Sequence, residues 1–125
     1  MIDSEVIDSS VWIAYFVNGD YQKEIENDKQ IIVSVISLIE VPKKLSLLNI
    51  PMEEIKKNIE SIKKRAILKD VTKEIAEQSL TFIINKRLHM ADAIIYATAI
   101  MSNSKLLTLD NDFRGLTNVT ILESS

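Results

Sequence analysis

Short runs of apolar residues alternate along the chain with longer stretches in which apolar residues recur every three or four positions. The short runs are rich in Val and Ile, which is typical of strands that are buried on both faces of a sheet. They predict strands over residues 5–8, 31–34, 67–68, 105–109 and 119–122. The longer stretches predict helices over residues 11–17, 37–48, 51–65, 72–86 and 89–103.

Several of these helices begin beside residues that commonly cap a helix. Ser9 or Ser10 is placed to cap the first helix and Thr72 the fourth, because their side-chain oxygens can accept a bond from a free backbone N–H. Ser37 and Glu40 have the S-x-x-E spacing of a capping box, which would begin the second helix at Ser37.

Strands that alternate with helices require crossover connections, and these imply parallel pairing with helices on both faces of the sheet. The predicted fold is therefore α/β, a three-layer α/β/α sandwich with a mainly parallel five-stranded sheet. A length of 125 residues and a mass of 14.2 kDa suit one hydrophobic core. We expect a single domain over residues 1–125.

The composition excludes several kinds of functional site. Without cysteine there is no disulfide framework, thiolate nucleophile or thiolate-held metal. His89 is the only histidine, so multi-histidine metal sites are excluded. The two glycines cannot form either of the glycine-rich phosphate-binding motifs.

The formal charge of −3, from 15 basic and 18 acidic residues, argues against a protein that holds nucleic acid by broad positive charge alone. No apolar run approaches the roughly 18 residues of a membrane span, and the N-terminus lacks the pattern of a signal peptide. We therefore expect a soluble, cytoplasmic protein that does not enter a membrane.

Four acidic residues occupy related places in the predicted fold. Asp8 and Asp110 end the first and fourth predicted strands, whereas Glu40 and Asp92 lie near the starts of two helices. Ligands of open α/β sheets bind outside the carboxyl ends of the strands, where the strand order reverses. If the first and fourth strands are neighbours, Asp8 and Asp110 face each other there, and the two helical acids can complete the cluster.

Four carboxylates in one place repel each other at neutral pH unless protons or cations are present. Carboxylate oxygens, without Cys or His, favour Mg²⁺ or Mn²⁺. Two such ions would change the formal charge from −3 to +1, so an acidic chain can still bind a polyanion.

Each acid also has a simpler interpretation. Asp8 can cap the following helix, Glu40 can complete the capping box, and Asp110 or Asp112 can form a turn. Asp92 is the hardest to explain in this way, because its neighbours are apolar and an isolated buried carboxylate is costly.

Four sequence blocks, V-I-D-S-S-V-W, S-L-I-E-V, A-D-A-I-I-Y-A-T-A and L-L-T-L-D-N-D-F, follow one another in this order. In order and spacing they resemble PIN domains, and in particular the VapC-type toxins of prokaryotic toxin–antitoxin pairs. The resemblance covers roughly residues 5–122 and implies a parallel sheet of order 3-2-1-4-5.

The resemblance also implies roles for individual residues. By this similarity Asp8, Glu40, Asp92 and Asp110 are the catalytic, metal-binding acids. The family's polar positions near these acids match Ser9, Ser10 and Thr108, and Asp112 matches an acid often found there, so the fourth acid is Asp110 or Asp112. Leu109 departs from a position that is often basic in the family.

The implied activity is that of an endoribonuclease, a Mg²⁺- or Mn²⁺-dependent hydrolase of RNA, regulated by a cognate antitoxin and forming a homodimer. Lys43 and Lys44 follow Glu40 closely enough to contact RNA phosphates, although a solvated helix face also explains them. The alternative function is a catalytically inactive PIN-fold module that binds RNA or protein. A phosphatase with an aspartyl nucleophile would need an acid two residues after Asp8, where this chain has Ser10.

Overall fold

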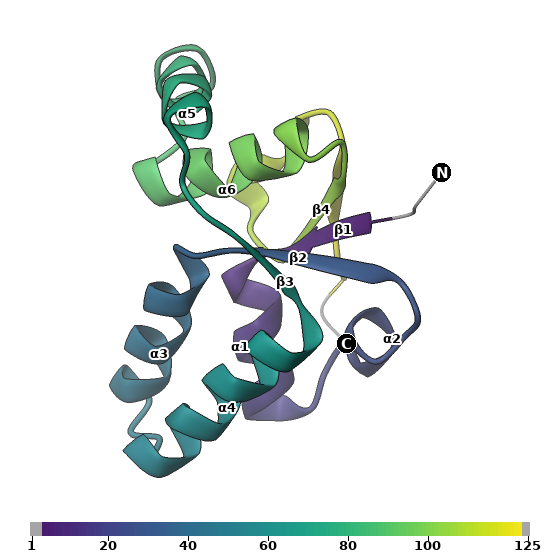
Figure 1. The fold of residues 1–125 in the computed structure, drawn as a ribbon, viewed down its shortest axis with the longest axis vertical. Helices are drawn as coiled ribbons and strands as arrows, with labels where there is room; N and C mark the ends of the chain where they lie inside the picture. Colours follow the sequence, from purple (N-terminus) through teal and green to yellow (C-terminus); the bar gives the residue numbers. More distant parts are fainter. Residues whose placement is uncertain (1–3, 124–125) are drawn as a thin grey trace.

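The computed structural model describes residues 4–123. Five strands form one parallel sheet in the order β3-β2-β1-β4-β5, which confirms the predicted sandwich and strand order (Figure 1). The strands are β1 (Ser4–Ile7), β2 (Gln30–Ser34), β3 (Ile67–Lys69), β4 (Lys105–Thr108) and β5 (Val119–Ile121). Ile7 pairs with Leu107, so the carboxyl ends of β1 and β4 lie level with each other at the centre of the sheet.

Helices cover both faces of this sheet (Figure 1). They are α1 (Ser9–Asn18), α2 (Gln22–Ile25), α3 (Ser37–Leu47), α4 (Met52–Arg65), α5 (Lys73–Lys86) and α6 (Met90–Met101), with a 3₁₀ turn η1 (Asn111–Phe113) after β4. In the view of Figure 1, α1, α3 and α4 lie below the sheet, and α5 and α6 lie above it. Within the described residues, no helix has the length and apolar composition needed to cross a lipid bilayer.

The helix ends show which capping predictions were correct. Thr72 caps α5, since its Oγ1 accepts a hydrogen bond from the Ile75 N–H at 3.1 Å. The prediction that Ser9 or Ser10 caps α1 is wrong, because both residues lie inside the helix and Asp8 takes the capping position. The helix ends at Gly19, whose φ of +73° allows its N–H to bond the Tyr15 carbonyl at 3.0 Å.

Successive strand residues point to opposite faces of the sheet, and this alternation divides the core in two. One cluster packs sheet residues against α1, α2, α3 and α4: Ile7, Ile31, Val33 and Leu107. The other packs sheet residues against α6 and its surroundings: Val6, Ile32 and Leu106. Both faces are apolar, which explains why the strands appear in the sequence as continuous apolar runs.

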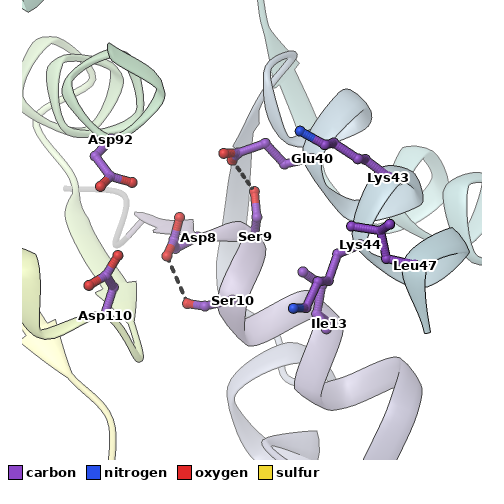
Figure 2. A pocket seen from close by; sticks show the side chains of 10 residues that line it. All are labelled: Asp8, Ser9, Ser10, Ile13, Glu40, Lys43, Lys44, Leu47, Asp92 and Asp110. Carbon is purple, nitrogen blue, oxygen red and sulfur yellow. Dashed lines mark hydrogen bonds between the residues drawn. The ribbon is translucent and has the colours of Figure 1, made fainter. Parts of the chain in front are cut away.

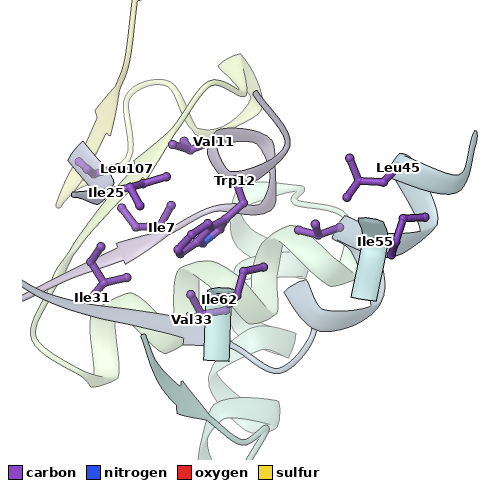
Figure 3. Packing of buried hydrophobic residues seen from close by; sticks show 11 residues of the cluster. Ile7, Val11, Trp12, Ile25, Ile31, Val33, Leu45, Ile55, Ile62 and Leu107 are labelled. Carbon is purple, nitrogen blue, oxygen red and sulfur yellow. The ribbon is translucent and has the colours of Figure 1, made fainter. Parts of the chain in front are cut away.

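The larger side chains of the first cluster gather around Trp12 of α1, which is fully buried (Figure 3). Ile62 of α4 and Val41 and Leu45 of α3 belong to the same cluster, so α1, α3 and α4 pack as one layer. This packing matters for function because α1 begins directly after Asp8 and α3 carries Glu40 in its first turn.

Candidate active site

A pocket of about 540 Å³ opens at the carboxyl ends of β1 and β4 (Figure 2). Four of its lining residues are acids, Asp8, Glu40, Asp92 and Asp110. The remaining lining residues are polar, basic or aliphatic: Ser9, Ser10, Ile13, Lys43, Lys44 and Leu47. The structure thus brings together side chains from the residue after β1, from α1, α3 and α6, and from the loop after β4.

Asp8 lies at the inner end of the pocket and is only 5% exposed. Its Oδ2 accepts hydrogen bonds from Ser10 Oγ and Thr108 Oγ1, both at 2.7 Å. Its side chain makes no capping bond to α1, so the interpretation of Asp8 as only a helix cap is wrong. The two hydroxyls hold one carboxylate oxygen, and the other points toward Asp92 in Figure 2.

Glu40 reaches the same pocket from the first turn of α3. Its Oε1 accepts a hydrogen bond from Ser9 Oγ at 2.7 Å, and that hydroxyl also lies 2.8 Å from Ser37 Oγ. The predicted capping box is wrong, because the capping position is Ile36 and no side chain caps the helix. Since α1 packs against α3, Ser37 and Glu40 both meet Ser9 instead of bonding the backbone of their own helix.

Asp92, Asp110 and Asp112 approach each other closely, with one carboxylate oxygen from each lying within 4.8 Å of the others. Asp110 Oδ1 also accepts a bond from the Asp112 N–H at 2.8 Å, which confirms its turn-forming interpretation. The Asp110 N–H bonds Thr108 Oγ1 at 3.0 Å, which links the loop to the residue that holds Asp8. Asp110 lines the pocket, whereas Asp112 is exposed beside it.

Burial and repulsion from neighbouring acids raise the pKa values of Asp92, Asp8 and Glu40. Burial, followed by the charges of Asp110, Asp8 and Glu40, raises the pKa of Asp92 to about 6. Burial raises the pKa of Asp8 although hydroxyl groups bond it, and burial raises the pKa of Glu40 with a further contribution from Asp8. The cluster therefore carries more negative charge than the protein around it neutralises.

A hard divalent cation fits this cluster. The carboxylate and hydroxyl oxygens are the donors that Mg²⁺ and Mn²⁺ prefer, and a cation would relieve the repulsion among the acids that, after burial, contributes to the raised pKa of Asp92. Asp92 and Asp110 belong to the close group of three acids, and Asp8 faces them across the pocket (Figure 2).

The remaining predicted residues lie where they can act on the same pocket. Hydroxyls at positions 9, 10 and 108 bond the acids directly, and the exposed Lys43 and Lys44 line the side of the pocket across from Asp92 and Asp110 (Figure 2). Sequence reasoning missed Ile13 and Leu47 as lining residues. Helical spacing could have found Leu47, because it lies seven residues after Glu40 on the same face of α3.

Comparisons with known proteins agree with this fold. The family model described as PIN domain matches residues 6–118. A toxin–antitoxin complex from Klebsiella pneumoniae superposes with a TM-score of 0.80 at 23% identity, covering 93% of this chain and 95% of that one. No curated protein matches the chain by sequence.

Two further solved structures share the fold at lower identity. VapC20 from Mycobacterium tuberculosis, described as a sarcin–ricin loop cleaving toxin, gives a TM-score of 0.73 at 17% identity, covering 90% of this chain and 95% of that one. VapBC2 from Rickettsia felis, bound to a DNA fragment from its promoter, gives a TM-score of 0.72 at 18% identity. It covers 96% of this chain and 97% of that one.

Proposed function

The chain belongs to the PIN domain family, and from this premise we propose that it is an endoribonuclease that requires Mg²⁺ or Mn²⁺ and serves as the toxin of a toxin–antitoxin pair. The convergence of Asp8, Glu40, Asp92 and Asp110 on one pocket is the observation that carries the proposal. The family match and the toxins among the similar structures support it.

In this proposal Asp8, Asp92 and Asp110 hold the cation, with Asp112 as an auxiliary ligand. A bound divalent cation would supply positive charge to the phosphodiester and make water easier to deprotonate. Glu40, which enters the pocket from α3, orients the attacking water and accepts its proton. Ser9 holds the Glu40 carboxylate, and Ser10 and Thr108 hold that of Asp8.

Lys43 and Lys44 are proposed to contact RNA phosphates as the strand enters. Both are exposed, and within residues 4–123 neither makes an ion pair shorter than 4 Å, although the charge of Lys43 also acts on the Glu40 carboxylate. This positive side of the pocket offsets the repulsion between the acids and the RNA backbone. In this proposal the protein acts on its RNA substrate in the cytoplasm.

We propose two protein partners, a cognate antitoxin and a second copy of the chain. Toxin–antitoxin complexes among the similar structures support the first. Large apolar side chains exposed on α5 and at the start of α6 support the second: Leu80, Ile84 and Met90, at 57%, 67% and 70% exposure. Sedimentation equilibrium of the purified chain tests the homodimer.

Cleavage of RNA by the purified protein tests the activity. We expect cleavage with Mg²⁺ or Mn²⁺, its loss with EDTA, and its recovery when excess metal is restored. The Asp92→Asn variant should lose at least 100-fold in rate, because it removes a cation ligand while keeping the shape of the side chain. Sequencing of the RNA ends would identify the cleavage position.

The matched control is Asp28→Asn, the same change at an exposed acid just before β2, at the amino end of the strand and so on the side of the sheet away from the pocket. It should cleave like the unaltered protein. Full activity of a folded Asp92→Asn protein would refute the assignment of the site. RNA binding without cleavage under any metal condition would favour the inactive binding module instead.

A further inference from the structure

Three carboxylates that approach each other closely come from two parts of the chain. Asp92 lies in the first turn of α6, whereas Asp110 and Asp112 lie after β4 in what we call the acidic turn (residues 110–113). Figure 2 shows Asp92 and Asp110 on these two segments. We propose that Tyr96 is a positioning residue that ties the acidic turn to α6, so that the acids of both can bind one cation. This inference rests on the proposed function and deepens it.

The acidic turn needs such a tie because its acids and Asp92 repel each other. One oxygen from each of the three carboxylates lies within 4.8 Å of the others. Like charges this close favour a wider separation unless a cation or the surrounding structure opposes it. Asp92 is carried by a helix of 12 residues, whereas η1 has only three, so the acidic turn is the part more easily displaced.

Tyr96 lies one helical turn after Asp92 on α6, so the two side chains leave the same face of the helix. The Tyr96 hydroxyl donates a hydrogen bond to the Thr117 carbonyl at 2.9 Å and lies 3.1 Å from Thr117 Oγ1. Thr117 lies between η1 and β5, in the same connection as the acidic turn. Within residues 4–123, no other hydrogen bonds join α6 to the connection between β4 and β5.

The aromatic ring of Tyr96 supplies a second contact. Its centroid lies 6.5 Å from that of Phe113, which ends η1 directly after Asp112 and is fully buried. The ring of Phe82 on α5 lies 4.7 Å from the Tyr96 ring and limits its movement. Both separations are within the range of favourable aromatic contacts. The connection that carries the acidic turn therefore meets Tyr96 at two points, a buried ring and a backbone carbonyl.

The hydroxyl group is the part of Tyr96 that core packing does not explain. Tyr96 is only 3% exposed, and phenylalanine would fill nearly the same space without a polar atom to satisfy. Burying a hydroxyl costs free energy unless it is hydrogen-bonded, and the partner here is Thr117. The tie to the connection between β4 and β5 is therefore what tyrosine adds at this position.

Tyr96→Phe tests the proposal, because it removes the hydroxyl and keeps the ring. We expect it to raise the Kd for Mn²⁺ about three- to tenfold, less than the roughly 10- to 100-fold effect of groups that bond a metal-binding side chain directly. Electron paramagnetic resonance of free Mn²⁺ measures this Kd on the purified full chain without RNA. In RNA cleavage, the Mn²⁺ concentration for half-maximal rate should rise by the same factor, while the rate at saturating Mn²⁺ changes by less than about twofold.

Tyr21→Phe is the matched control. The Tyr21 hydroxyl also bonds a backbone carbonyl, that of Glu123 at 2.8 Å, and Tyr21 lies just before α2, outside the pocket. This variant loses a hydrogen bond of the same kind, and its Kd for Mn²⁺ should not change. Thermal unfolding in EDTA measures the stability that each variant loses.

Two results would overturn the proposal. One is a lower Tm of the Tyr96→Phe protein in EDTA with an unchanged Kd for Mn²⁺, which would assign Tyr96 a purely structural role. The other is an equal rise in Kd for Tyr21→Phe. Failure of the proposed function would be seen separately, as Mn²⁺ binding by the unaltered protein without cleavage of RNA.

Discussion

At the scale of single residues, Thr108 connects two of the acids. Its buried hydroxyl donates to Asp8 Oδ2 at 2.7 Å and accepts from the Asp110 N–H at 3.0 Å. Groups that hydrogen-bond a metal-binding side chain in this way fix its orientation toward the cation. The position of Thr108 at the end of β4 therefore matters as much as its polarity.

Replacing Thr108 with Val keeps the shape of the side chain but removes both hydrogen bonds. We expect Thr108→Val to lower activity about 10- to 100-fold and to raise the Mn²⁺ concentration needed for half-maximal cleavage. A metal titration of RNA cleavage measures both effects. Recovery of activity at high Mn²⁺ would show that the side chain acts by positioning Asp8.

Thr98→Val is the matched control, since Thr98 is equally buried and, among residues 4–123, its hydroxyl bonds only the Ile94 carbonyl within α6, at 2.8 Å. Its metal requirement should not change. The proposed role of Thr108 fails if both variants show the same metal requirement as the unaltered protein.

The pattern of apolar and polar residues could predict where these acids lie in the fold. Asp8 and Glu40 lie near the starts of helices that follow strands, and Asp92 lies near the start of a helix that precedes one. The pattern could not predict that Ser9 meets Ser37 and Glu40, since these partners lie 28 and 31 residues away in the sequence. The S-x-x-E spacing indicated a local contact, and packing of α1 against α3 replaced it with a contact between helices.

At the scale of elements, Arg65 ties the end of α4 to the segment that leads into β2. Its Nε donates to the Ile25 carbonyl at 2.6 Å, and its Nη2 donates to the Asn27 and Lys29 carbonyls at 3.0 and 2.8 Å. A planar guanidinium can reach several acceptors at once, and an ammonium group cannot copy this geometry.

We therefore expect Arg65→Lys to lower the free energy of unfolding by about 1–3 kcal/mol, because the part-buried Ile25 and Asn27 carbonyls lose their donors. Urea unfolding followed by circular dichroism measures this change. Lys64→Ala, at the neighbouring exposed position, should change the free energy of unfolding by less than about 0.5 kcal/mol. Equal stability of the Arg65→Lys protein and the unaltered one would contradict this function of Arg65.

Element positions were largely predictable because strand and helix periods differ clearly in this chain. The short helix α2 (Gln22–Ile25) was not expected, since four residues are too few to show a helical period. Basic residues in the last turn of a helix, as in α4, are sufficiently explained by a favourable interaction with the helix dipole. Sequence alone could not reveal the contacts of Arg65, since they lie 36 to 40 residues away.

At the scale of the whole molecule, the alternation of strands and helices predicted a parallel sheet, but the order of the strands came from the family resemblance. The order decides the site, because it places β1 beside β4 and so brings Asp8 level with Thr108. The strand order also gathers the acids at the carboxyl ends of the strands. Repulsion between these carboxylates lowers the stability of the folded state when no cation is bound.

The last prediction concerns how stability depends on pH and metal. Because the pKa of Asp92 is raised from 3.8 to about 6, the folded protein binds more protons than the unfolded chain between these values, and this group lowers stability as pH rises through that range. Asp92→Asn removes the effect. In EDTA its Tm should therefore match that of the unaltered protein near pH 4 and exceed it by about 2–5 °C above pH 7.

Saturating Mn²⁺ should reverse this ranking above pH 7. A cation that binds only the folded state, at 100 times its Kd, stabilises it by about 2.7 kcal/mol, and the unaltered protein should gain more than Asp92→Asn. Near pH 4, below its pKa of about 6, Asp92 is protonated and cannot serve as a cation ligand, so Mn²⁺ should change neither Tm. The Asp28→Asn protein should follow the unaltered one throughout. Thermal unfolding at both pH values measures these shifts, and an equal gain from Mn²⁺ in the unaltered and Asp92→Asn proteins would place the cation elsewhere.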